Sequence, residues 1–238
     1  QREFVWSEEQ IERLFDSIMR GYPIGSFLFW KVSKESVKKY QFYEFICHYH
    51  QGKTHNQKAV LLGDEEIISV LDGQQRLTSL YIALKGSYAS KIPYRRWDNP
   101  NAFPKRYLYI NLLKEANNED LKYDFRFLTE EDAKKRDENT FWFKVGDILK
   151  FDPQDPSQVN DYLIENQLAT NKFASRTLFR LSDVIFKQPI INYYLEEDQE
   201  LDKVLNVFIR VNSGGTQLSY SDLLLSIATA QWDEKDAR

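Results

Sequence analysis

Cysteine is nearly absent from this chain: its 238 residues include a single one, Cys47. An internal disulfide is therefore excluded, and a reducing, cytoplasmic compartment is the natural expectation. The chain also lacks an apolar run near the roughly 20 residues that a membrane-spanning helix needs, and no signal peptide is visible. We therefore expect no membrane partner.

An excess of positive charge is also missing. The chain carries 32 Lys and Arg against 36 Asp and Glu, a net charge of −4. A broad nucleic-acid footprint would show as net positive charge or a long basic stripe. The basic residues instead form short clusters, which we interpret as solvated surface: Lys38-Lys39, Arg95-Arg96, Lys105-Arg106 and Lys134-Lys135-Arg136. Any nucleic-acid contact must therefore be local or supplied by another part of the protein.

Histidine is scarce, and the three present are His48, His50 and His55. With Cys47 they match no usual zinc framework, because alternation along a strand would split the ligands between faces. The run 52–54 (Gly-Lys-Thr) imitates the end of a P-loop, but cysteine stands where that motif needs its first glycine. Zinc binding and a P-loop are both rejected.

The remaining composition supports a folded core, with 42% hydrophobic and 15% aromatic residues. One large domain or two closely packed subdomains would both fit this length. The chain begins with Gln1 rather than methionine and stops soon after a predicted helix. We therefore expect a piece of a longer protein.

Local patterns predict an α+β fold. A capping box at Ser7 and Gln10 opens a helix that Gly21 ends. Residues 59–62 and 66–71 are predicted to form a β-hairpin. Further strands are predicted at 27–32, 106–113, 122–128 and 189–195, and helices at 74–85, through most of 129–188, at 201–211 and at 223–232.

The run 71–80 (Leu-Asp-Gly-Gln-Gln-Arg-Leu-Thr-Ser-Leu) joins a predicted strand to a predicted helix. Asp72 is placed to cap the helix, and Gly73 can take an unusual backbone conformation. Arg76 falls in the first helical turn, where the helix dipole disfavours a cation. Gln74 and Gln75 have no evident packing role. An anion bound at this helix end would account for the arrangement, so we predict a phosphate site.

A second polar constellation, 212–216 (Asn-Ser-Gly-Gly-Thr), follows the helix at 201–211. Its glycines permit close approach to a ligand, and backbone N–H groups there would form a second lip of the phosphate site. An ordinary joint between two helices explains the same residues, and the sequence leaves both interpretations open.

The run 72–76 (Asp-Gly-Gln-Gln-Arg) resembles the signature of the N-terminal domain of GmrSD-type, modification-dependent (type IV) restriction proteins. Residues 6–25 resemble that family's opening helix and following loop, and 208–219 resemble its second signature, with Phe208 and Asn212 at matching positions. The resemblance implies a ParB/sulfiredoxin-like α+β core at 1–128, a helical insertion at 129–188, and a return of 189–238 to the core.

The resemblance also implies binding or hydrolysis of a nucleoside triphosphate (GTP, UTP or ATP), coupled to restriction of modified foreign DNA in phage defence. A full-length member usually adds a C-terminal HNH-type nuclease domain. The chain has no histidine after His55 to serve such a domain, so cleavage by that route is not expected here.

The leading hypothesis is therefore a regulatory nucleoside triphosphatase domain of a restriction protein. Its predicted catalytic residues are Asp72, which would also hold Mg²⁺, Gln74, Gln75 and Arg76. Its predicted nucleotide-binding residues are Gly73, Thr78, Asn212, Ser213, Gly214 and Gly215.

Two alternatives stay open. The chain could be a non-catalytic module for modified DNA, with Trp30, Tyr94 or Trp97 stacking on a flipped base near Arg95 and Arg96. The 72–76 site could instead nick DNA. The sequence is compatible with a homo-oligomer without requiring one.

Overall fold

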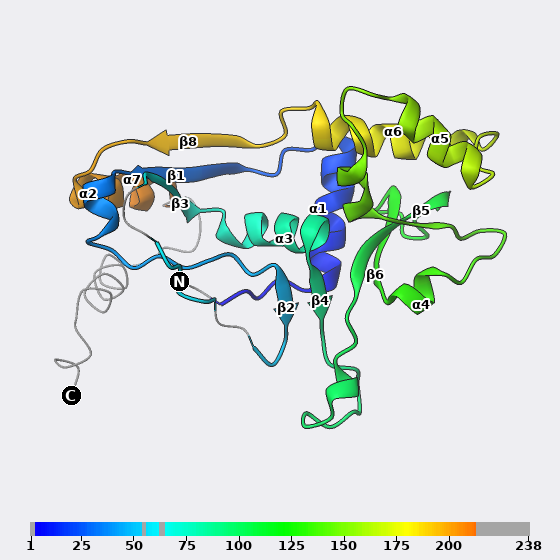
Figure 1. The fold of residues 1–238 in the computed structure, drawn as a ribbon, viewed down its shortest axis with the longest axis horizontal. Coiled ribbons are helices and arrows are strands. Elements are labelled where there is room, and N and C mark those ends of the chain that lie inside the picture. Colours follow the sequence, from blue (N-terminus) through cyan, green and yellow to red (C-terminus); the bar gives the residue numbers. More distant parts are fainter. Residues whose placement is uncertain (1–2, 54–55, 62–64, 213–238) are drawn as a thin grey trace.

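The computed structural model describes residues 3–53, 56–61 and 65–212 (Figure 1). Its α-helices are α1 (Glu8–Arg20), α2 (Lys34–Val37), α3 (Gln74–Lys85), α4 (Glu130–Ala133), α5 (Ser157–Glu165), α6 (Lys172–Phe186) and α7 (Leu201–Asn212). Its strands are β1 (Ser26–Val32), β2 (His48–His50), β3 (Ile67–Asp72), β4 (Ser87–Ala89), β5 (Tyr107–Glu115), β6 (Tyr123–Leu128), β7 (Trp142–Lys144) and β8 (Asn192–Glu196). Short 3-10 helices lie at η1 (Pro100–Ala102) and η2 (Val145–Lys150). The predicted α+β class is confirmed.

The first sheet has the strand order β3-β1-β8. β1 pairs antiparallel with β3, with Trp30 opposite Ser69, and parallel with β8, with Phe27 opposite Tyr193. The predicted hairpin between 59–62 and 66–71 is wrong, because β3 takes β1 as its partner and the described residues 59–61 form no strand. The partner of β3 is therefore β1, a strand from early in the chain, and not the neighbouring segment 59–62 that the sequence favoured.

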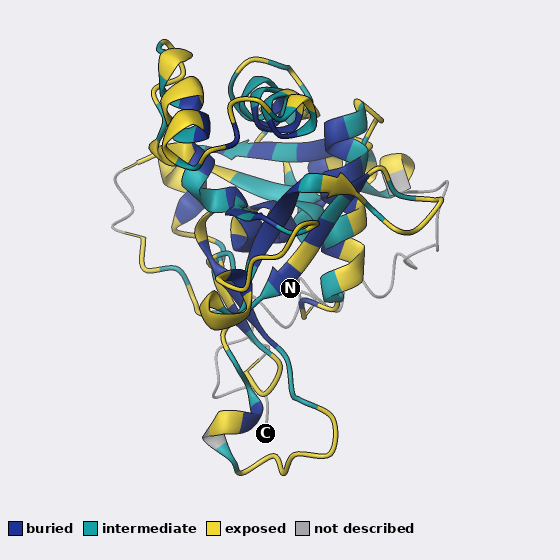
Figure 2. Cartoon of the chain, turned by 90° about the vertical axis from the view of Figure 1, so that its right-hand side faces the viewer, coloured by how far each residue is buried: buried dark blue, intermediate teal, exposed yellow. Residues whose placement is uncertain are grey.

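The second large sheet has the order β6-β5-β7 and carries most of the core. Its antiparallel strands β5 and β6 confirm the two strands predicted at 106–113 and 122–128. Helices α1 and α6 pack on this sheet and bury Phe15, Leu178, Ile110 and Phe125. Figure 2 shows the buried residues gathered in this body and the exposed ones on its outer helices.

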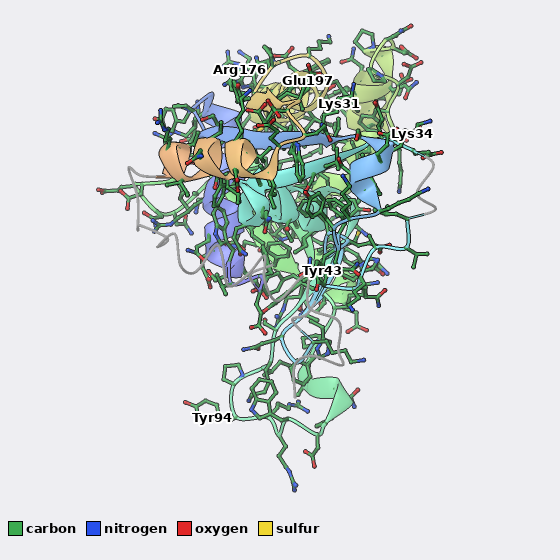
Figure 3. The ribbon with its side chains drawn as sticks, turned by 90° about the vertical axis from the view of Figure 1, so that its left-hand side faces the viewer. Lys31, Lys34, Tyr43, Tyr94, Arg176 and Glu197 are labelled. Carbon is green, nitrogen blue, oxygen red and sulfur yellow. The ribbon has the colours of Figure 1, made fainter. Side chains whose placement is uncertain are left out.

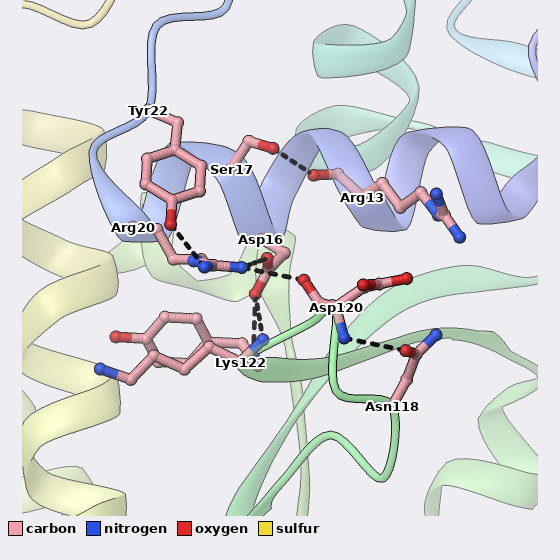
Figure 4. A network of polar contacts seen from close by, with 9 residues as sticks. Arg13, Asp16, Ser17, Arg20, Tyr22, Asn118, Asp120 and Lys122 are labelled. Carbon is pink, nitrogen blue, oxygen red and sulfur yellow. Dashed lines mark hydrogen bonds and ion pairs between the residues drawn. The ribbon is translucent and has the colours of Figure 1, made fainter.

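Helix α1 begins and ends as its sequence predicts. The capping box at Ser7 and Gln10 is present, and Gly21 takes a left-handed conformation with φ 77° at the C-terminal end. A polar network ties this helix to β6 (Figure 4). The buried Asp16 carboxylate accepts hydrogen bonds from the backbone N–H groups of Lys122 and Tyr123, each at 2.9 Å, and pairs with Arg20 at 3.3 Å.

The segment 129–188 is mostly helical, as expected, but it also contributes β7 to the sheet of β5. β8 in turn brings 189–212 back to β1. The division into a core, an insertion and a returning segment stays a prediction. Within the described ranges, no helix is long and apolar enough to cross a bilayer.

Glu12 on α1 is a partly buried titratable group. Its carboxylate accepts a hydrogen bond from the backbone N–H of Phe127 at 2.9 Å. Burial raises the pKa of Glu12 from 4.5 to about 7, and the hydrogen bond from Phe127 offsets only part of this rise. The neighbouring carboxylates of Glu8 and Glu9 raise the pKa further.

This raised pKa predicts a pH-dependent stability. The folded chain keeps a proton on Glu12 that the unfolded chain releases near pH 4.5, so this contribution is lost as pH rises through about 7. We expect Glu12→Gln to remove a slope of up to about 1.4 kcal/mol per pH unit from the free energy of unfolding. Urea unfolding at several pH values across this window measures the slope. The exposed Glu138→Gln variant is the control, because Glu138 is not among the charges that shift the pKa of Glu12. Equal slopes in the Glu12 variant and the parent would contradict the prediction.

Candidate functional site

The junction between β3 and α3 is built on Gly73. This residue is the N-cap of α3, with φ 88° and ψ 12°. A Cβ at this position would overlap the ring of Phe27 on β1. The unusual conformation predicted for Gly73 is therefore confirmed, and the close approach of β1 gives a second reason for glycine here.

The expectation that Asp72 caps α3 is wrong. Asp72 is the last residue of β3, opposite Leu28, and the N-cap residue that follows it makes no side-chain capping bond. The Asp72 carboxylate instead pairs with Arg76 at 3.2 Å. Among the described residues, the backbone N–H groups of the first turn of α3 therefore have no side-chain cap.

Arg76 has protein partners that account for its place in the first turn. Its Nη1 donates to the carbonyl of Ile24 at 2.6 Å, and its Nη2 donates to the carbonyl of Ser26 at 2.9 Å. The guanidinium also lies 4.6 Å from the ring centroid of Phe27. The argument that the helix dipole requires a bound anion beside Arg76 is therefore weakened, because carbonyls and Asp72 already supply negative charge.

Gly25 makes this contact with Arg76 feasible. Its φ is 82°, and a Cβ there would overlap Arg76 Nη1. The loop between α1 and β1 meets the run 72–76 at this guanidinium, although Ile24 and Arg76 are 52 residues apart in the sequence. The sequence did not predict that this loop belongs to the site. Gly25, in the tight loop 22–25, was the one feature that could have indicated a close contact there.

The two glutamines have structural partners, contrary to expectation. Gln74 donates to the carbonyl of Val70 at 2.9 Å. Gln75 accepts from the backbone N–H of Val5 at 3.0 Å and donates to the carbonyl of Glu3 at 2.8 Å. Gln75 thus holds the N-terminal segment on α3. Thr78 is only 4% exposed, so its predicted contact with a ligand stays a prediction that the burial does not favour.

The first sheet has one covered face and one more open face. On the covered face, Trp30 and Val32 pack with Val37 of α2 and Val204 of α7. Side chains alternate along a strand, so Phe27 and Phe29 point to the other face. This open face includes Ile68 and Tyr193, which are 63% and 57% exposed, and the Arg76 guanidinium of α3 lies at one end of it, over the Phe27 ring.

An aromatic row leads along this open face from Arg76. The ring centroids of Phe27 and Phe29 are 6.0 Å apart, and those of Phe29 and Tyr193 are 5.1 Å apart. Arg76 covers the first ring of the row. The site therefore combines a partly exposed Arg–Asp pair, the first turn of a helix and a line of aromatic rings.

The predicted second lip lies mostly outside the described residues. Asn212 is the last residue of α7, and Ser213, Gly214 and Gly215 fall in the part that is not described. Whether 212–216 meets the run 72–76 therefore stays a prediction. The rejection of zinc also stays a prediction; in the described part of the chain, no three His, Cys, Asp or Glu side chains gather as metal ligands.

These features define an α+β domain whose site is a strand–turn–helix junction clamped by an arginine. Sequence comparison is more specific: the family model described as the N-terminal domain of GmrSD restriction endonuclease matches residues 1–229. The chain belongs to this family, which confirms the resemblance to GmrSD-type N-terminal domains. It is also similar to an uncharacterised protein of Methanocaldococcus jannaschii, 26% identical over 240 residues. That match covers 95% of this chain but 37% of the relative, so the chain spans little more than a third of that protein.

The close contact of Gly25 with the Arg76 guanidinium predicts that a single added methyl group lowers the stability of the fold. We expect Gly25→Ala to lower the free energy of unfolding by about 2 kcal/mol, because alanine disfavours positive φ and its Cβ would displace the guanidinium. Gly52→Ala is the control: that glycine has ordinary contacts to His50 and no positive φ, so a change within about 0.5 kcal/mol is expected. Urea unfolding compares the two variants, and equal stability would rule out the clamp.

Proposed function

We propose that the domain binds a nucleoside triphosphate at the start of α3 and hydrolyses it. The observation that carries the proposal is the first turn of this 12-residue helix, which has no side-chain cap from the described residues and lies beside a partly exposed arginine. Backbone N–H groups at a helix N-terminus bind phosphate oxygens, and the helix dipole favours their charge. Membership of the GmrSD N-terminal family supports a role in restriction, in which such a domain would act.

Arg76 would stabilise the negative charge on the phosphates. Among the described residues, the guanidinium donates three hydrogen bonds, to Ile24, Ser26 and Asp72. A guanidinium has five N–H groups, so others remain for a phosphate. The two carbonyls fix the plane of the guanidinium before a ligand arrives. A group held in this way loses little entropy when charge develops during phosphoryl transfer.

Asp72 fits the part of a ligand for substrate-bound Mg²⁺. Its carboxylate is 30% exposed and lies 3.2 Å from Arg76, at the edge of the phosphate site. Mg²⁺ is usually held by one or two carboxylates together with substrate phosphates, and it would supply charge neutralisation there. Asp72 would also accept a hydrogen bond from the attacking water and so orient it.

The aromatic row would hold the base of the nucleotide. Phe29 and Tyr193 present rings on the same sheet face as Arg76, and Tyr193 is more than half exposed. Stacking on an aromatic ring stabilises a bound base by about 1–3 kcal/mol and tolerates different bases. GTP, UTP and ATP therefore all stay candidates.

In the full-length protein, we propose that this domain regulates restriction of modified foreign DNA in phage defence. A C-terminal HNH-type nuclease domain would cut the DNA. This part of the proposal rests on the family to which residues 1–229 belong and on the much greater length of the relative.

Two neighbouring tyrosines test nucleotide binding. Tyr193 and Tyr194 are 57% and 56% exposed, and alternation on β8 places them on opposite faces. We expect Tyr193→Ala to weaken triphosphate binding about tenfold, because a stacked ring is lost, and Tyr194→Ala to leave it unchanged. Calorimetric titration with each triphosphate and Mg²⁺ measures both. If no triphosphate binds, or if the two variants behave alike, the proposed site is wrong.

Turnover is tested separately. We expect Asp72→Asn to abolish Mg²⁺-dependent release of inorganic phosphate while binding of the triphosphate is largely kept, since the amide can still accept a hydrogen bond from Arg76. Circular dichroism controls for the fold. Undiminished phosphate release from this variant would remove Asp72 from the catalytic residues.

A further inference from the structure

Residues 90–106, which we call the arm, project from the body between β4 and β5 (Figures 1 and 3). Hydrogen bonds close its stem: the backbones of Tyr88 and Arg106 pair with each other, and the N–H of Ile92 donates to the carbonyl of Ala102 at 2.7 Å. The stem is also anchored sideways, because Phe103 stacks on His50 with ring centroids 4.5 Å apart. The arm therefore has a defined conformation.

The arm concentrates positive charge on an acidic chain. Its only acidic residue is Asp98, and its basic residues are Lys91, Arg95, Arg96, Lys105 and Arg106. Arg106 pairs with Glu8 at the stem. Arg96 pairs with Asp98 at 3.2 Å, but these side chains are 85% and 69% exposed. An ion pair that is this exposed contributes little stability. A phosphate can therefore replace Asp98 as the partner of Arg96 at small cost.

Two aromatic side chains are exposed on the arm. Tyr94 is fully exposed at its tip (Figure 3), and Trp97 is 60% exposed. Tyr94 also has φ 63°, which is unfavourable for a bulky residue. Neither side chain belongs to the core clusters. Within the arm, Trp97 has its ring centroid 5.5 Å from that of Phe103 and 5.5 Å from Lys91 Nζ, and these contacts hold the indole in place while more than half of it stays exposed. Trp30 differs: it is 4% exposed and donates to the carbonyl of Asp198, so it cannot stack on a base.

We propose that the arm binds DNA, with Arg95 and Arg96 on backbone phosphates and Trp97 and Tyr94 stacked on an unpaired base. Basic side chains beside exposed rings are the combination that holds a single strand, because the charges follow the backbone and the rings accept bases. The net negative charge of the chain disfavours a broad contact of the body with the same strand. This surface is separate from the triphosphate site and does not depend on it.

The test measures binding of fluorescein-labelled single-stranded DNA, by anisotropy, without nucleotide and at several salt concentrations. We expect the variant Arg95→Ala/Arg96→Ala to bind more weakly and to reduce the salt slope by about 1.4, which corresponds to two lost phosphate contacts. The control is Lys38→Ala/Lys39→Ala, which removes the same charge from another exposed basic pair and should change neither quantity. Equal effects of the two double variants would overturn the proposal.

Trp97→Ala tests the stacking directly. We expect this variant to lose about tenfold or more of the affinity for single-stranded DNA. We also expect the parent chain to bind a fully paired duplex more weakly than the single strand. A preference for the duplex, or for RNA of the same sequence, would overturn the assignment. Triphosphate titrations of all arm variants should match the parent, so failure of the arm and failure of the triphosphate site give different results.

Discussion

The Arg76 guanidinium is the contact on which the shape of the site depends. It joins the loop before β1 to the start of α3 through the carbonyls of Ile24 and Ser26. Glycine is needed at position 25 because a side chain there would fill the space of the Arg76 guanidinium. Glycine is needed at position 73 because a side chain there would fill the space of the Phe27 ring. The turn, the loop and the ring are therefore mutually dependent, and loss of one displaces the others.

This dependence reconciles a structural and a functional role for one arginine. Carbonyl partners hold the guanidinium in place without neutralising it, and Asp72 is its only carboxylate partner among the described residues. The first turn of α3 meanwhile has no side-chain cap within the part of the chain that the structure describes. A positive group and free N–H groups are thus fixed in position before any ligand binds, which lowers the entropy lost on binding an anion.

Local patterns in the sequence were sufficient for much of the fold. The capping box of α1, the alternation in β6 and the helix after Gly73 each depend on residues close together in the chain. Pairings between distant segments were not predictable in this way. β8 pairs with β1, and the nearby bond between Trp30 and Asp198 spans 168 residues.

The candidate site shows the same limit. Its run 72–76 was visible in the sequence, but the partners of Arg76 and of both glutamines are mainly backbone groups. Backbone acceptors have no residue identity, so no pattern of side chains reveals them. The capping role given to Asp72 was wrong for a related reason: a left-handed glycine takes the N-cap position, and the aspartate is left to pair with arginine.

Helix α3 connects the two surfaces proposed to bind phosphate groups. The proposed triphosphate site is at its first turn, and its last turn leads through Gly86 and β4 into the arm; the 12-residue helix itself is about 18 Å long at about 1.5 Å per residue. That last turn has no free space: a Cβ at Gly86 would overlap the carbonyl of Cys47, and one at Gly146 would overlap that of Leu84. Because close-packed backbone resists local deformation, these contacts fix the last turn of α3 against its neighbours. The stem of the arm, which follows this helix after one short strand, therefore starts from a firmly held position.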